Sequence, residues 1–221
     1  MAARQQSPST AADPVAWLVF VDDLHLDFRN TGRIRQLVQI FLNDIVLEGD
    51  LVAIRTSGPS VVLTDFSSAR ELLPVLKKLS GGGLRPNDII GKVLGDEEMP
   101  YRARTALSSA TAAAALLSQV EPRRRALLYV SNGYGLDTRT LLEARALAHV
   151  ARTNGVRIVT IDAASMDRSP RDPVTDRAWE AYRTAARESL RALAEQSGGF
   201  AILDVEDARA ALQRVSNTVR Q

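Results

Sequence analysis

The sequence predicts an α/β domain of three layers, in which helices cover both faces of a doubly wound, mostly parallel sheet with one antiparallel edge strand. Two observations support this fold class. Apolar runs such as WLVFV (residues 17–21) and ALLYV (residues 126–130) are typical of strands that are buried on both faces. Segments with apolar residues at helical spacing separate these runs along the chain.

The amino-terminal half supplies the first strands of the predicted sheet. Residues 1–14 are polar, and we expect them to form a disordered arm or linker before a folded domain at residues 15–221. The expected elements are a strand at 17–21, a helix that Asn30 or Thr31 caps and Gly49 closes, a strand at 51–56, a Ser-Gly-Pro turn at 57–59, an antiparallel strand reaching residue 63, and a short helix at 68–79.

The carboxyl-terminal half continues the alternation of strands and helices. The expected elements are a helix at 101–120, a strand at 126–130, a helix from Asp137 to Gly155, a strand at 156–163, a helix with an apolar stripe from Trp179 to Leu193, a strand at 200–205 and a helix at 208–219. Residues 80–100 and 165–176 are expected to be mobile loops, and the three glycines at 81–83 to be a hinge.

Composition excludes several classes of partner and chemistry. The 221 residues carry a net charge of only +2, and no basic block is interleaved with aromatic residues, so we expect no nucleic-acid partner. No apolar stretch is long enough to cross a bilayer, so no direct membrane insertion is expected. The chain has no cysteine, which excludes disulfides and thiolate chemistry.

Polar residues gather where the predicted strands end. Ligands of such sheets bind at the carboxyl ends of the strands. Asp22, Asp23 and His25 follow the strand at 17–21, and Asn132 follows the strand at 126–130. Thr105 lies near the start of the helix at 101–120. These five residues form the predicted binding rim.

These positions resemble those of a von Willebrand factor A domain. That family has an apolar strand ending in Asp-x-Ser-x-Ser, a threonine near the start of a later helix, and a strand ending in Ser-Asp-Gly, which together form the metal-ion-dependent adhesion site. The matching positions here are Asp22, Leu24, Leu26, Thr105 and Asn132. The resemblance covers residues 15–220, so the folded domain at 15–221 is expected to be a von Willebrand A-like domain.

The phrases VFVDDLHLDF, LVAIRT and TIDA are similar to a bacterial VWFA-related subgroup of the Acidobacteria type. Members of that subgroup are usually longer and begin with an export signal. The resemblance therefore implies an extracytoplasmic or secreted location for this chain if a signal segment has been removed.

The departures from the family pattern weaken the expected metal site. Magnesium prefers about six oxygen ligands. Leu24 and Leu26 have no side-chain oxygen, and Asn132 lacks the negative charge of aspartate. The remaining metal ligands would be Asp22, Thr105 and Asn132, a set that could hold only a weakly bound, largely hydrated Mg²⁺ or Mn²⁺. We therefore expect a degenerate site with no certain cofactor.

Simpler interpretations compete with each site residue. Asp22 and Asp23 could cap a turn, His25 could be a hydrogen-bonded loop residue, and Thr105 could be an ordinary helix hydroxyl. Enzyme motifs fail as well. The phosphate-loop pattern has Pro86 where it needs glycine, no Gly-x-Ser-x-Gly elbow exists, and Leu24 replaces the second aspartate of an Asp-x-Asp nucleophile.

We therefore predict a non-enzymatic module for adhesion or assembly that binds a protein partner. Two alternatives remain open. One is a metal-assisted hydrolase in which Asp22 and Asp23 hold an ion and His25 or Asp162 is the base. The other is a structural subunit of an envelope assembly that binds no ligand, which a rim sealed by Leu24 and Leu26 would favour.

Overall fold

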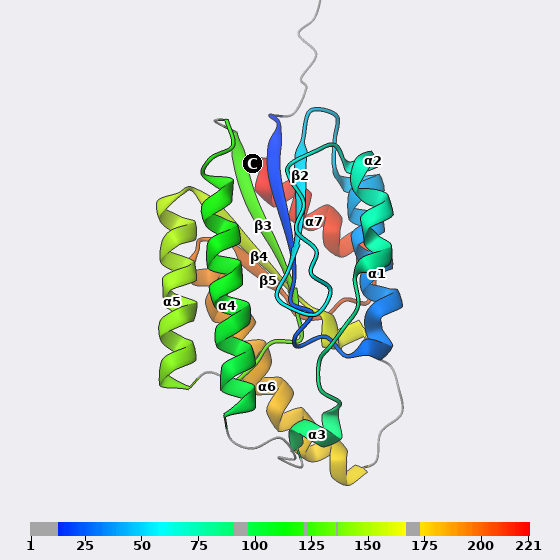
Figure 1. Cartoon of the computed structure of the whole chain (residues 1–221), viewed down its shortest axis with the longest axis vertical. Helices are drawn as coiled ribbons and strands as arrows, with labels where there is room; N and C mark the ends of the chain where they lie inside the picture. The colour runs from blue at the N-terminus through cyan, green and yellow to red at the C-terminus, as the bar shows by residue number, and fades with distance from the viewer. Residues whose placement is uncertain (1–12, 91–96, 122, 136, 167–172) are drawn as a thin grey trace, which may run out of the picture.

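The computed structural model describes residues 13–90, 97–121, 123–135, 137–166 and 173–221 (Figure 1). A five-stranded parallel sheet of order β2-β1-β3-β4-β5 forms the middle layer, which confirms the predicted α/β class. Its strands are β1 (Val15–Val21), β2 (Leu51–Thr56), β3 (Arg124–Ser131), β4 (Val156–Asp162) and β5 (Phe200–Ile202). The predicted arm at residues 1–14 lies almost wholly outside the described residues.

Helices cover both faces of the sheet (Figure 1). One layer contains α1 (Thr31–Ile40) with the π-helical turn Phe41–Ile45, α2 (Ala69–Leu72) with the 3-10 turn Leu73–Lys78, and α7 (Ala208–Arg220). The other layer contains α4 (Glu98–Leu117), α5 (Thr138–Thr153) and α6 (Pro173–Gln196). The short α3 (Pro86–Ile90) packs against α6 beyond the carboxyl ends of the strands.

Burial on both faces explains the unbroken apolar sequence of β1. All seven residues of this strand are buried. Trp17 faces the layer of α1 and α7, where its ring meets Phe41 edge-on at 5.2 Å between ring centroids. Phe20 faces the layer of α4 and α5 and stacks on Tyr129 of β3 at 5.1 Å. A strand with two buried faces has no reason to alternate apolar and polar residues.

The predicted antiparallel edge strand is not regular. The chain after β2 does run antiparallel beside it, but it forms only the isolated bridges Val52↔Ser67 and Arg55↔Leu63. Val61 has a φ of 46°, and the Ile54 amide donates to the Thr64 hydroxyl at 2.8 Å, not to a backbone carbonyl. Both features interrupt a ladder of backbone hydrogen bonds. The described sheet therefore has five strands where about six were expected.

The two predicted irregular loops contain short helices. Within residues 80–100, the chain forms α3 and begins α4 at Glu98, three residues before the predicted start. Within residues 165–176, a 3-10 turn (Ala163–Met166) precedes α6, which begins at Pro173. Residues 91–96 and 167–172 of these loops lie outside the described residues, so their predicted mobility stays a prediction.

Candidate functional site

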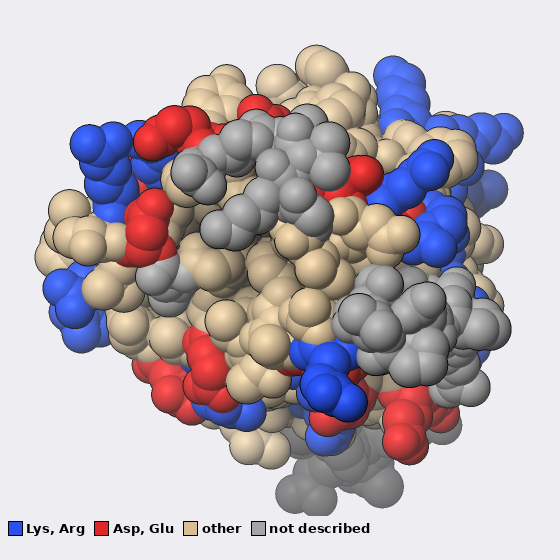
Figure 2. Space-filling view, turned by 90° about the horizontal axis from the view of Figure 1, so that it is seen from below, with Lys and Arg blue, Asp and Glu red and all other residues tan. Residues whose placement is uncertain are grey.

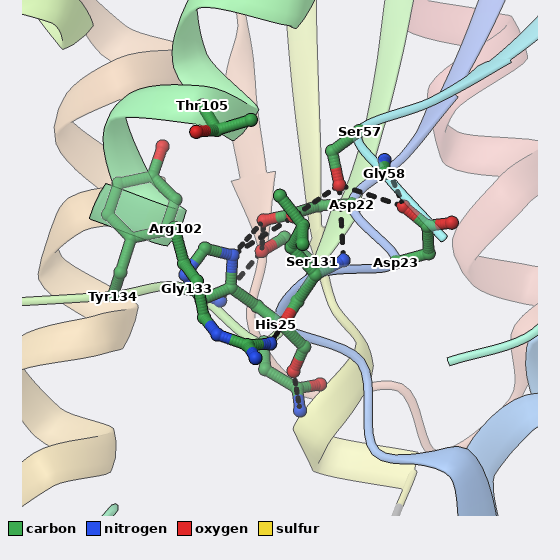
Figure 3. Close-up of polar contacts among 12 residues, drawn as sticks. Asp22, Asp23, His25, Ser57, Gly58, Arg102, Thr105, Ser131, Gly133 and Tyr134 are labelled. Atoms are coloured by element: carbon green, nitrogen blue, oxygen red, sulfur yellow. Dashed lines mark hydrogen bonds and ion pairs between the residues drawn. The ribbon is translucent and has the colours of Figure 1, made fainter. Parts of the chain in front are cut away.

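The candidate rim residues lie where the strand order reverses. The chain passes from β1 to β2 on one side and to β3 on the other, so the switch point lies between the carboxyl ends of β1 and β3. Asp22 and Asp23 follow β1, and Asn132 follows β3. Figure 3 shows Asp22 surrounded by His25, Ser57 and Ser131, with Thr105 on the helix above them.

The Asp22 carboxylate is fully buried and bonded at both oxygens. His25 Nδ1 lies 3.0 Å from Oδ1 and 2.8 Å from Oδ2. The Ser57 hydroxyl lies 2.9 Å from Oδ1, and the Ser131 hydroxyl donates to Oδ2 at 2.7 Å. Neither serine is among the five predicted rim residues, although each lies at the carboxyl end of a predicted strand. Asp22 thus joins the ends of β1, β2 and β3.

These contacts keep Asp22 ionised. Burial alone would raise the pKa of Asp22, but the positive potential and hydrogen bond of His25 oppose it, and the two serine hydroxyls add to the opposition. The pKa of Asp22 consequently lies below its usual range. Because an ionised carboxylate can only accept, Nδ1 of His25 is the donor in this contact.

Asp23 holds a turn. Its Oδ1 accepts from the Gly58 amide at 2.7 Å, and its Oδ2 accepts from the Ser60 amide at 2.7 Å. The Ser57 hydroxyl lies 2.9 Å from Asp23 Oδ1 and also accepts from the Leu24 amide at 3.1 Å. These contacts support the turn-capping interpretation of Asp23. The turn that it caps follows β2, however, and is distant in sequence.

The other candidate positions offer a cation few free oxygens. Leu26 is buried in the core at 1% exposure, and Leu24 packs over Gly58. Since α4 begins at Glu98, Thr105 lies well inside the helix, where its hydroxyl donates to the Tyr101 carbonyl at 2.9 Å. The Asn132 amide nitrogen donates to the His25 carbonyl at 2.8 Å, while its buried Oδ1 has no hydrogen-bond partner among the described residues.

This arrangement does not fit a magnesium or manganese site. Two positions of the family pattern carry no side-chain oxygen. The oxygens of Asp22 already accept hydrogen bonds from four side chains, those of His25, Ser57, Ser131 and Tyr129. Over the part of the chain that the structure describes, no group of three His, Cys, Asp or Glu side chains could hold a metal ion. A hard cation needs more oxygen ligands than this rim offers.

The three glycines at 81–83 form a tight contact, so the predicted hinge is wrong. The Gly82 amide donates to the Asp23 carbonyl at 2.7 Å, and the Gly83 amide donates to the Leu26 carbonyl at 2.8 Å. A Cβ on Gly81 would lie 2.4 Å from the Leu26 oxygen. Glycine is needed here because two backbone segments approach closely, which leaves no room for a side chain.

Arg102 supplies a fixed positive charge at the rim. Its Nη1 donates to the Leu24 carbonyl at 3.1 Å and to the Gly82 carbonyl at 3.0 Å, and its Nε bonds Glu98 at 2.6 Å. One guanidinium therefore joins α4, the segment after β1 and the three glycines (Figure 3). No sequence pattern indicates this role, beyond the position of Arg102 one helical turn before Thr105.

Asp162, the second candidate base, is held at the end of β4. Its Oδ2 accepts from Arg187 Nε at 2.9 Å and from Arg183 at 3.3 Å, and its Oδ1 accepts from the Ala164 amide at 2.9 Å. Burial raises the pKa of Asp162, while the two arginines act in the opposite direction. Asp162 therefore ties β4 to α6.

Comparison with known proteins identifies the fold. No protein-family model and no curated protein matches the chain. Solved structures do resemble it over nearly its whole length. The vWF domain of the type V pili tip protein Mfa5 from Porphyromonas gingivalis aligns with a TM-score of 0.56 and 11% identity, covering 95% of this chain and 96% of that one.

The conserved hypothetical protein BatB from Bacteroides thetaiotaomicron aligns with a TM-score of 0.55 and 14% identity, covering 95% of this chain and 100% of that one. An aerotolerance-related membrane protein from Bacteroides fragilis, crystallised with multiple mutations to serines, aligns with a TM-score of 0.54 and 11% identity, covering 93% and 98%. The chain therefore has a von Willebrand factor A-like fold, as the sequence resemblance implied.

Proposed function

We propose that this domain is a protein-interaction module whose face at the carboxyl ends of the strands binds a partner without a metal ion. One observation carries the proposal: both oxygens of Asp22, the central candidate ligand, are bonded within the protein. The neighbours include a pilus tip protein and a membrane protein, which supports a role in adhesion or assembly outside the cytoplasm. None of the described helices is long and apolar enough to span a membrane.

The contacts of the rim argue against the hydrolase alternative. A metal-assisted hydrolase would need Asp22 and Asp23 to coordinate an ion and a base to face the activated water. Asp22 and Asp23 are both fully buried and bonded to protein groups. His25 Nδ1 faces Asp22, and its ring is also buried. These residues stabilise the rim, and the proposed contact with a partner lies on the surface around them.

The surface of this face supports binding over a purely structural role. Figure 2 shows the face with uncharged side chains in its hollowed centre and charged side chains of both signs around them. Phe28 and Tyr101, which belong to the segments at this end of the sheet, are 69% and 59% exposed. Exposed aromatic side chains are typical anchors of protein interfaces.

We expect the melting temperature of the protein to be the same in EDTA and in millimolar Mg²⁺ or Mn²⁺. A ligand stabilises a folded protein only when its concentration exceeds its Kd, and this rim offers a cation too few free oxygens. Thermal unfolding followed by circular dichroism measures this directly. A rise in melting temperature with either ion that EDTA reverses would contradict the proposal.

Partner binding itself can be tested with surface variants. Cross-linking in the native cell should capture a protein partner whose binding resists EDTA. Phe28→Ser and Tyr101→Ser should weaken the capture. Leu47→Ser should not, because Leu47 is also exposed, at 47%, but precedes β2 and so lies at the opposite end of the sheet. Equal capture by all three variants would place the interface elsewhere.

A further inference from the structure

Two segments at the side of α1 and α2 carry an excess of positive charge. Residues 27–35 lead from β1 into α1, and residues 77–85 lead from the 3-10 turn after α2 to α3. Together they hold six cations and one carboxylate, a net charge of +5, whereas the whole 221-residue chain carries only +2. We call these cations the basic seam: Arg29, Arg33, Arg35, Lys77, Lys78 and Arg85.

Hydrogen bonds hold the two segments side by side. Asp27 and Gly83 form a parallel bridge. Farther along, the Arg35 guanidinium donates to the Lys77 carbonyl at 2.8 Å and to the Leu79 carbonyl at 2.9 Å. Figure 2 shows Lys and Arg side chains gathered on this side of the face, at the right of the view, which is also the side of α1 and α2 in Figure 1. The six cations therefore belong to one surface.

Most of this positive charge is available to a partner. Over the described part of the chain, no ion pair neutralises four of the cations, namely Arg35, Lys77, Lys78 and Arg85. The bonds of Arg35 go to backbone carbonyls, which carry no net charge. Every cation of the basic seam is exposed except Arg35, which is half-buried.

The one carboxylate of the two segments does not offset this charge. Asp27 is buried, and its side chain accepts from the Arg29 guanidinium at 2.7 Å and from the Arg29 amide at 2.8 Å. The carboxylate therefore serves one arginine and the cap of the first turn after β1. Like charges held this close on a protein surface attract an oppositely charged partner.

An exposed aromatic side chain lies within the same segment. Phe28 is 69% exposed and directly precedes Arg29. Aromatic and arginine side chains are both enriched in protein interfaces, and the aromatic ones often supply the anchor. An aromatic side chain among cations therefore suits a partner segment that has acidic residues and an apolar one.

The fixed geometry of the seam favours a protein over a lipid surface or a nucleic acid. Arg29 is held by Asp27, and Arg35 is held by two carbonyls. Fixed guanidinium groups can select carboxylates at fixed positions, whereas lipid headgroups need only positive charge. Phe28 is the only large exposed apolar side chain among the described residues of the two segments. One ring forms neither a face that enters a membrane nor a stacking platform for bases.

We propose that the basic seam binds an acidic segment of the protein partner, with Phe28 as the apolar anchor beside it. The inference rests on the proposed function and adds the chemistry of the partner. The carboxylates of this segment pair with the cations that have no ion pair within the domain. Because the attracting charge comes from side chains, this contact needs no metal ion.

Selection of random linear peptides displayed on phage against the full 221-residue chain tests the proposal. We expect the selected peptides to share several Asp or Glu residues and an apolar residue. A synthetic copy should bind about tenfold or more weakly when glutamine replaces its acidic residues, because the charge complementarity is lost. Raising the salt from about 50 to about 500 mM should weaken the acidic peptide as well, because salt screens exposed charges.

A matched pair of double variants locates the contact. Lys77→Glu with Lys78→Glu reverses two charges of the seam and should weaken the acidic peptide about tenfold or more. Arg145→Glu with Arg152→Glu changes the net charge equally but lies on α5, in the opposite layer, and should leave affinity within about twofold. The seam variant should also bind a peptide with lysine in place of glutamate better than the wild type does, which loss of structure cannot produce.

Selected peptides without acidic residues, equal losses in the two double variants, or no selected peptide would each overturn the inference. Sedimentation of the wild type with vesicles of phosphatidylserine and phosphatidylcholine, undisturbed by the acidic peptide, would overturn it too and assign the seam to a membrane surface. Capture of a partner that resists EDTA would then still support the proposed function alone.

Discussion

Replacing Asp22 with alanine should lower the free energy of unfolding by about 3–5 kcal/mol, the usual cost of removing one member of a buried charged pair. The variant leaves His25 without its counter-ion and the hydroxyls of Ser57 and Ser131 without their acceptor, all in a buried site. Urea denaturation followed by circular dichroism gives the change in free energy, provided that the slope of the transition is unchanged.

The sign of this change distinguishes a structural anchor from a metal ligand. In a site built for a cation, removing one of two adjacent carboxylates relieves repulsion and stabilises the metal-free protein. A variant as stable as the wild type, or more so, would therefore contradict the role that we assign to Asp22. Asp65→Ala is the control, because Asp65 is exposed and its loss should cost less than about 0.5 kcal/mol.

Gly133→Ala should lower the free energy of unfolding by about 2–5 kcal/mol, from backbone strain and overpacking together. Gly133 has a φ of 73°, and a Cβ there would lie 2.3 Å from the Ala186 carbonyl oxygen of α6. Helix α6 would have to move away from the end of β3. Thermal and urea unfolding measure the loss.

Gly155→Ala separates the two causes. Gly155 has a similar φ of 64°, but nothing lies within 4 Å of a Cβ built there. This variant should lose only the cost of the left-handed backbone, about 1–2 kcal/mol. Equal losses in the two variants would mean that the approach of α6 to Gly133 contributes nothing to stability.

The sheet could be predicted from the sequence because its strands are buried on both faces. The apolar run of β1 has no other simple interpretation once its length is considered. The sequence does not predict equally well whether the segment after β2 forms a regular edge strand. Whether residues after β2 form a ladder depends on the φ of Val61 and on a bond to the Thr64 hydroxyl, neither of which leaves a pattern in the sequence.

The location of the candidate site at the ends of the strands could be predicted from the sequence, but the contacts within it could not. Asp22 and Asn132 could be placed near each other because parallel strands end at one edge of the sheet. The partners of Asp22 could not be chosen, because serines such as Ser57 and Ser131 are common at strand ends. The three glycines were misinterpreted because glycine permits both flexibility and close packing, and only the neighbouring backbone decides between them.

The bonds of Asp22 also bear on how the domain opens. One carboxylate joins the ends of β1, β2 and β3, whereas Asp162, Arg187 and Asp204 join the ends of β4 and β5 to α6. Local unfolding follows groups of elements that share such contacts. Because β3 and β4 are paired over seven residues, the two sets of bonds brace one continuous sheet, and we expect its strands to exchange their amide hydrogens as a single cooperative unit.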